Sequence, residues 1–107
     1  MAESVLEADL LAVFRAWHAV RKIWDQPPAR EYVTEDGEVR SHTFDFLVEF
    51  WSGRRIAYPV KSTRYAAIDG IDETLELIRN QSLDGFADDV VLVTEKEVPR
   101  RVVHNAR

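Results

Sequence analysis

The chain of 107 residues contains no cysteine, a single methionine, and only four glycines and four prolines. Without cysteine it has neither a disulfide framework nor a thiolate metal site, which agrees with a cytoplasmic protein. It also has no apolar run near the roughly 20 residues of a membrane span and no signal-peptide pattern. We therefore expect a cytoplasmic protein without a membrane partner.

An excess of positive charge is also missing, since the formal net charge is −5 at pH 7. Phosphate binding favours a basic face, so any affinity for nucleic acid is expected to be modest or supplied by a partner. Basic residues still cluster locally, at Arg21–Lys22, Arg54–Arg55, Lys61 with Arg64, and Arg100–Arg101.

The three histidines, His18, His42 and His104, are scattered along the sequence without a metal-ligand spacing. Histidine is most often found at least partly exposed. We therefore expect each of them at the surface or at a helix end.

Length and composition predict one globular domain over residues 1–107, because 46% of the residues are hydrophobic and 31% charged. Hydrophobic periodicity and turn residues predict an α/β fold with a mixed central sheet flanked by helices. The expected order is helix, antiparallel meander, helix, strand, helix. Its segments are a helix over 3–18, a strand over 20–24, a hairpin over 30–34 and from 39 onward, strands within 41–63, a helix from Asp69 or Asp72 to near Gly85, a strand over 90–93, and a final helix within 95–107. That last helix is either short or cut by the end of a fragment.

The stretch from Ser41 to Thr63 organises this prediction. Phenylalanine and valine alternate with other residues from Phe44 to Phe50, which is typical of a strand that runs directly on from the preceding hairpin. Asp45 therefore falls in mid-strand, where a carboxylate needs a partner. A three-residue loop of Ser52, Gly53 and Arg54 would place Asp45 opposite Lys61 and Leu47 opposite Pro59 on one face of the sheet.

Glu7 has two interpretations on the first helix, whose apolar stripe is Leu6, Leu10, Val13, Phe14 and Trp17. In the first, Ser4 is the N-cap and Glu7 reaches back to its amide, as in a capping box. In the second, Glu7 points from the buried face toward the sheet and binds a metal. The helix alone leaves both open.

The chain resembles the PD-(D/E)xK nuclease fold and, within it, the N-terminal domain of TnsA-type transposon endonucleases. The resemblance is carried in order by the Ser4–Glu7 helix, the strand ending at Gln26-Pro27, the stretch 43–48, the stretch 59–61, the stretch 92–94 and Asn105-Ala106. It implies a restriction-endonuclease-like core with a catalytic site made of Glu7, Asp45 and Lys61.

The resemblance also implies DNA as substrate, a transposase subunit or other protein as partner, and Mg²⁺, or Mn²⁺ in its place, as the only cofactor. Carboxylates of Asp45 and Glu7 and the backbone carbonyl of Val60 would hold the metal, since hard cations prefer oxygen ligands. Such an ion polarises a scissile phosphate and lowers the pKa of an attacking water. Lys61 would position that water or stabilise developing negative charge.

The sequence departs from the family at two positions. Phe44 stands where a proline usually precedes the aspartate, and this position contributes no ligand. Pro59 stands at the usual acid position two residues before the lysine, so we expect weakened metal binding. Proline also lacks an amide donor, so its strand must be unpaired, bulged or at an edge there.

Two hypotheses follow, and a third stands beside them. The chain is an endonuclease subunit that cleaves DNA at transposon ends with a transposase, or a catalytically impaired nuclease-fold module that binds DNA or a protein partner. In the second case Asp45 and Lys61 remain as a structural ion pair. The third hypothesis is a structural or interaction domain unrelated to nucleases.

Overall fold

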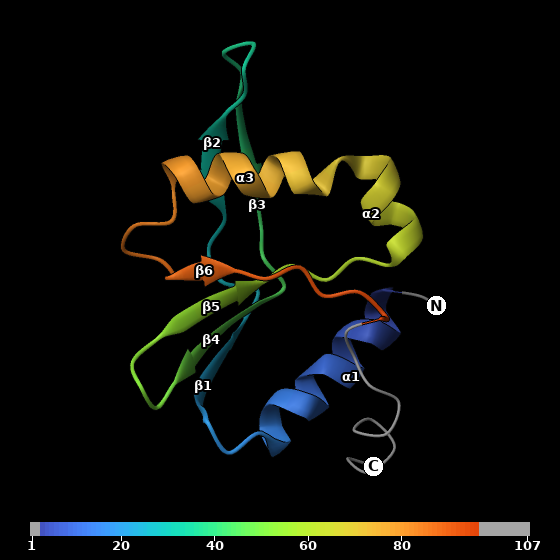
Figure 1. Ribbon diagram of the computed structural model, residues 1–107, viewed down its shortest axis with the longest axis vertical. Helices are drawn as coiled ribbons and strands as arrows, with labels where there is room; N and C mark the ends of the chain where they lie inside the picture. The colour runs from blue at the N-terminus through green and yellow to red at the C-terminus, as the bar shows by residue number, and fades with distance from the viewer. Residues whose placement is uncertain (1–2, 97–107) are drawn as a thin grey trace.

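The computed structural model describes residues 3–96 and has a mixed α/β architecture, as expected (Figure 1). The final helix expected within 95–107 falls almost entirely outside these residues. The elements are α1 (Glu3–Ala16), β1 (Val20–Asp25), β2 (Arg30–Val33), β3 (Val39–His42), β4 (Phe46–Phe50), β5 (Arg55–Tyr58), α2 (Thr63–Asp69), α3 (Ile71–Gln81) and β6 (Asp89–Val90).

The main sheet has the strand order β1-β4-β5-β6, with β1, β4 and β5 antiparallel and β6 parallel to β5. Helix α1 covers one face, and α3 lies on the other (Figure 1). Successive residues of a strand face opposite sides. In β4, Phe46 and Val48 therefore pack on the α1 side while Leu47 packs on the α3 side. This strand reads as nearly continuous apolar sequence because both of its faces are covered.

The two helices contribute the apolar stripes that the sequence predicts. Leu6, Leu10 and Phe14 of α1 are buried in the first cluster, but Trp17 follows the end of the helix and is 46% exposed. The stripe of α3, made of Ile71, Leu75 and Ile78, is buried in the second cluster.

The helices differ from the sequence prediction in their ends and in the cap of α1. Helix α1 begins at Glu3, as predicted, but ends at Ala16 instead of His18, and α3 ends at Gln81 instead of near Gly85. Because α1 begins at Glu3, Ser4 lies inside its first turn and is not the N-cap that a capping box requires. Residues 62–68, for which the sequence predicts a loop or a first helical turn, form most of helix α2, which begins after Ser62. The Ser62 hydroxyl accepts a hydrogen bond from the Tyr65 N–H at 3.4 Å and serves as the N-cap.

The predicted hairpin of β2 and β3 is confirmed, but it forms a separate two-stranded sheet. Its turn has Gly37 at a φ of 86°, a conformation that glycine adopts readily. The hairpin is attached to the end of α3, since the Gln81 side chain bonds both the N–H and the C=O of Val33 at 2.7 and 2.8 Å. The expected continuous meander is therefore wrong, because β1 pairs directly with β4 and the hairpin lies outside that sheet.

Asp45 is not in mid-strand. The backbone bends between the end of β3 at His42 and the start of β4 at Phe46. Phe44 is fully buried in the α3-side cluster, whereas Phe46 belongs to the α1-side cluster. Two residues that are two apart in a straight strand would share a face, so the bend at Asp45 is what separates them.

The register between β4 and β5 also differs from the expected one. Leu47 pairs with Ala57, so Asp45 extrapolates to Pro59 and Lys61 lies two residues further on. The turn consists of Trp51, Ser52 and Gly53, and the Phe50 N–H bonds the Arg54 C=O at 2.8 Å. Gly53 has a φ of 90° at the last turn position, where three-residue hairpins need a left-handed residue. The prediction placed the turn one residue too late.

Pro59 interrupts the pairing of β5 with β6, as expected for a residue without an amide hydrogen. Continuous pairing ends with the pair of Ala57 and Val90, and it resumes as an isolated parallel bridge between Val60 and Val93. Pro59 itself is fully buried. No helix within residues 3–96 has the length and apolar character needed to cross a bilayer.

Candidate functional site

Asp45 lies at the bend where the backbone enters β4, and hydrogen bonds hold it on two sides. Its backbone carbonyl accepts a bond from the Gln26 N–H at 2.9 Å, which ties the bend to the end of β1. Its carboxylate Oδ2 accepts a bond from the Val60 N–H at 2.6 Å, which ties it to the segment that follows β5. The carboxylate therefore reaches across the open end of β4 to the backbone of Val60.

The backbone N–H and C=O of Val60 face Asp45 because the backbone groups of the adjacent residues, Pro59 and Lys61, are bonded to Val93 on the opposite edge. The Pro59 C=O and the Lys61 N–H both bond Val93, at 2.9 and 3.0 Å. In an extended backbone the N–H and C=O of one residue point to the same edge, opposite to those of the residues before and after it. The Val60 carbonyl therefore lies on the same side as the Asp45 carboxylate, beyond the point where β4 begins. Two of the predicted metal ligands are brought together here.

Lys61 follows Val60 directly and is half-buried. The positive charge of Lys61 acts on His42, whose pKa is lowered first by burial and then by this charge. Lys61 therefore lies near His42, at the end of β3, in the segment that follows β5. It is not opposite Asp45 in the strand register.

Glu7 comes from the first turns of α1 and is half-buried. Its neighbour Leu6 is 1% exposed and belongs to the same buried cluster as Val60 and Val93. This end of α1 therefore lies on the Val60 side of the sheet, which leaves the metal-binding interpretation of Glu7 open.

The donor atoms of this site suit a hard cation. Asp45 and Glu7 offer carboxylates and Val60 offers a carbonyl, and Mg²⁺ takes oxygen ligands and usually keeps several waters. Only two of these are acidic side chains, because Pro59 occupies the position of a third. Among the side chains that the structure describes, no group of three or more His, Cys, Asp or Glu is placed to hold a metal.

His42 is a residue of this region that sequence reasoning placed wrongly. It is half-buried rather than at the surface, and its ring packs edge-on against Phe44 with a centroid distance of 4.8 Å. Its Nε2 atom is buried and has no hydrogen-bond partner among the described residues. The sequence feature that could have predicted the partial burial of His42 is its position two residues before Phe44. The chain must enter the protein interior near His42 in order to bury the Phe44 ring.

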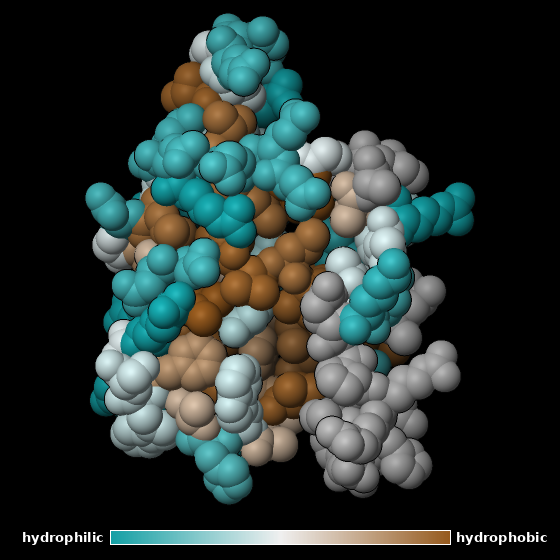
Figure 2. All heavy atoms as spheres, viewed as in Figure 1, coloured by the Kyte–Doolittle hydropathy of each residue, from teal (hydrophilic) through white to brown (hydrophobic). Residues whose placement is uncertain are grey.

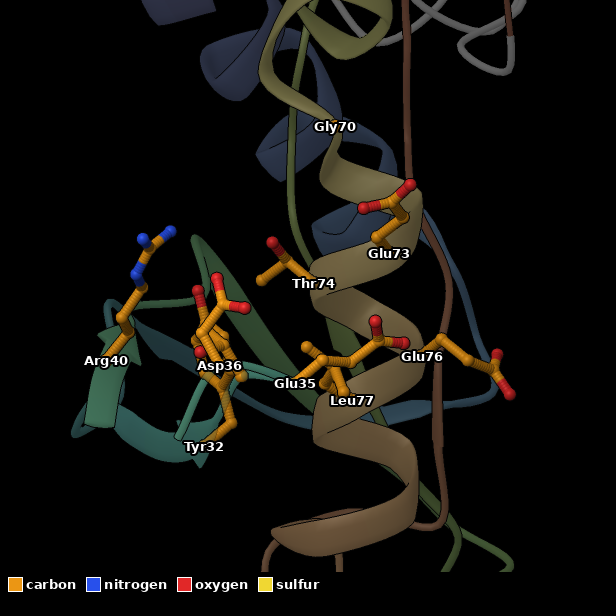
Figure 3. A pocket seen from close by; sticks show the side chains of 10 residues that line it. Tyr32, Glu35, Asp36, Arg40, Gly70, Glu73, Thr74, Glu76 and Leu77 are labelled. Atoms are coloured by element: carbon orange, nitrogen blue, oxygen red, sulfur yellow. The ribbon is translucent and has the colours of Figure 1, made fainter. Parts of the chain in front are cut away.

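A separate polar pocket of about 560 Å³ lies between the β2–β3 hairpin and α3 (Figure 3). Figure 3 shows Tyr32, Asp36 and Arg40 on the hairpin side, and Glu73 and Thr74 on the side of α3. Its lining includes four carboxylates and one guanidinium, which is already bonded to Glu38 at 2.6 Å. This acidic lining does not suit a phosphate ligand, and none of the predicted site residues contributes to it.

Hydrophobic residues gather in the middle of the face seen in Figure 2, and the tip of the β2–β3 hairpin is mostly hydrophilic. Comparisons of the sequence and the fold with protein-family models, with curated proteins and with solved structures found no match. The function is therefore inferred from the residues and their geometry.

Proposed function

We propose that this protein is a TnsA-like, metal-dependent endonuclease subunit with a restriction-endonuclease-like core. In this proposal it hydrolyses phosphodiester bonds of DNA at transposon ends, and a transposase subunit supplies the recognition of the end sequence. The observation that supports the proposal most directly is the contact of the Asp45 carboxylate with the Val60 backbone, directly before Lys61.

Each residue has a chemical role in this proposal. Asp45, the Val60 carbonyl and Glu7 would hold Mg²⁺ or Mn²⁺, which supplies Lewis-acid activation of the phosphate and of a water. Lys61 offers an ammonium group that attracts the negatively charged phosphate and stabilises charge that develops on its oxygens. The bend at Asp45 fixes the carboxylate before a ligand arrives, because hydrogen bonds restrain it on two sides.

A second function is favoured by Pro59. This fully buried proline occupies the position at which the family usually has an acidic residue. The proposed metal site therefore has two acidic ligands, Asp45 and Glu7, and lacks a third. The alternative proposal is a catalytically impaired nuclease-fold module that binds DNA or a protein partner.

The experiment that separates the two proposals is nicking of a supercoiled plasmid in the presence of Mn²⁺ or Mg²⁺. The endonuclease proposal predicts metal-dependent nicking that is lost in Asp45→Asn and in Lys61→Ala. Asp84→Ala, a change of an exposed carboxylate in the loop after α3, is the matched control and keeps the activity. Nicking that persists in both site variants contradicts the endonuclease proposal, and its absence from the wild-type protein favours the impaired module.

A further inference from the structure

Three contacts between a cation and a tryptophan ring involve five residues of β1, the β4–β5 turn and β5. Arg21 lies over Trp51 at 5.5 Å from the ring centroid, and Trp24 has Lys22 at 4.7 Å and Arg55 at 5.2 Å. Significant contacts of this kind occur about once per 70–80 residues, so three in one cluster exceed the usual density. We call these five residues the tryptophan–cation surface.

A β-bulge brings the two neighbouring cations of β1 to this surface. Val20 pairs with Phe50 and Lys22 pairs with Glu49, so Arg21 is an extra residue in the ladder. Consecutive residues of a regular strand face opposite sides, but a bulge redirects its side chains. As a result the Arg21 guanidinium reaches Glu49 at 3.2 Å, on the face that Lys22 also shares.

One carboxylate organises the cations without neutralising them all. Glu49 is only 12% exposed and binds Arg21 at 3.2 Å and Arg55 at 3.0 Å. The side chains of these two arginines remain 56% and 42% exposed. The Asp88 carboxylate also lies close, since it accepts a hydrogen bond from the Arg55 N–H at 2.8 Å. With Lys22, three cations still outnumber these two acids, which gives a locally positive surface on a protein whose net charge is −5.

Trp51 is the most exposed part of the surface, at 69%. Its backbone is held in the β4–β5 turn, since its N–H bonds the Ala19 C=O at 2.9 Å. A large ring presented by a fixed turn, with a guanidinium over it, offers an aromatic face together with positive charge. Proteins bind unpaired nucleotides in this way, by stacking bases on aromatic rings and pairing phosphates with cations.

We propose that the tryptophan–cation surface binds single-stranded DNA. The choice of DNA as the nucleic acid rests on the proposed function, but the binding requires neither the metal nor catalysis. Protein interfaces are also enriched in tryptophan and arginine, so the choice of nucleic acid over a protein partner rests on the excess of cations at this surface and on the exposed ring of Trp51. Trp51, the exposed ring of this surface, lies six residues from Asp45 along the chain, or about 20 Å at 3.3 Å per residue, whereas Trp24 pairs with Leu47 and lies nearer to Asp45. The exposed stacking ring of Trp51 is therefore distinct from the proposed catalytic site.

The test is the binding of a fluorescein-labelled oligothymidylate of about 12 nucleotides to the full-length protein in EDTA, followed by fluorescence anisotropy. Trp51→Ala is expected to weaken binding about tenfold or more, because one stacked base contributes on the order of 1–3 kcal/mol. Trp51→Phe restores part of the affinity. Arg21→Gln weakens binding and makes it less sensitive to salt, since one phosphate contact is lost.

Trp17→Phe is the matched control, because Trp17 is also exposed but packs against Phe50 outside the surface. This variant binds as the wild-type protein does, and thermal melting checks that every variant is folded. The proposal is overturned if the wild-type protein does not bind the oligomer. It is also overturned if Trp51→Ala binds normally, or if a duplex of equal length binds as tightly as the single strand.

The outcomes separate this proposal from the proposed function. A protein that binds the oligomer through Trp51 but does not nick plasmid keeps the surface and loses the endonuclease proposal. A protein that nicks plasmid but binds the oligomer independently of Trp51 loses only the surface.

Discussion

The Oδ2 atom of Asp45 accepts a hydrogen bond of 2.6 Å from the backbone N–H of Val60. Asp45 lies just before the first residue of β4, and Val60 lies just after Pro59, where the pairing of β5 is interrupted. The hydrogen bond therefore connects the two chain segments beyond the paired part of β4 and β5. It joins the two halves of the proposed metal site and also satisfies an amide that β4 leaves without a strand partner. Asp45 therefore has a structural role whether or not it also binds a metal.

Removal of this carboxylate is expected to destabilise the fold. Asp45→Ala leaves the N–H of the buried Val60 without its carboxylate acceptor, which costs about 1–3 kcal/mol in the free energy of unfolding. Asp45→Asn keeps an acceptor oxygen and loses less. Urea unfolding of the two variants and of Asp84→Ala measures these differences, and an Asp45→Ala variant as stable as the wild type would contradict the structural role.

Replacement of Pro59 tests whether the missing acid limits metal binding. Pro59→Glu restores both a carboxylate and an amide hydrogen beside the proposed ligands, so the affinity for Mn²⁺ is expected to rise about tenfold, or roughly 1.4 kcal/mol. Pro59→Gln restores the amide hydrogen without the charge and is the matched control. Calorimetric titration measures the Mn²⁺ affinity of both variants. Equal affinities would show that position 59 is not part of a metal site.

The start of α2 at Thr63 is held by a carboxylate whose titration should change the stability of the protein. Glu95 accepts hydrogen bonds from the Thr63 hydroxyl at 2.5 Å and from the Thr63 N–H at 3.0 Å, and these bonds lower the pKa of Glu95. Because the folded protein has the lower pKa, this stabilisation is present above the unfolded value of about 4.3 and is lost as the pH falls through the folded pKa. Thermal melting from neutral to acidic pH should show a smaller decrease for Glu95→Gln than for the wild type. Identical slopes would rule out this contribution.

His42 predicts a second pH dependence at higher pH. Burial and the charge of Lys61 lower the pKa of its imidazole, so the folded protein favours the neutral ring. The unfolded protein binds the proton more readily, and stability should therefore fall as the pH drops below about 6.5. His42→Phe removes this slope, and its stability at neutral pH should be similar or higher, because the buried Nε2 has no partner among the described residues. Unfolding in urea at a series of pH values measures the slope, and an unchanged slope in His42→Phe would contradict this assignment.

Local patterns predicted those parts of the fold that depend on local chemistry. The stripe of Ile71, Leu75 and Ile78 follows from helical periodicity, and the turn with Gly37 follows from turn chemistry. The interruption at Pro59 follows from the missing amide hydrogen. Each of these features is decided within a few residues of the sequence.

The position of Asp45 could not be predicted in the same way. The alternation from Phe44 to Phe50 is compatible with one straight strand and also with a bend that sends Phe44 and Phe46 into different buried clusters. Only the complete fold shows that the bend is present. The register has a similar ambiguity. Moving the three-residue turn by one position shifts the pairing by two residues and keeps every side chain on its face, so periodicity does not choose between the two turns. The conformation of Gly53 makes that choice.

The central claim is that Asp45 and the Val60 carbonyl hold a divalent metal beside Lys61. Calorimetric titration of Mn²⁺ into the wild-type protein and into Asp45→Asn tests it most directly, because the substitution keeps the hydrogen bond to Val60 available and removes the charge. We predict one Mn²⁺ bound per wild-type molecule and at least about tenfold weaker binding to the variant. Equal binding by the two proteins, or no binding by the wild type, would contradict the claim.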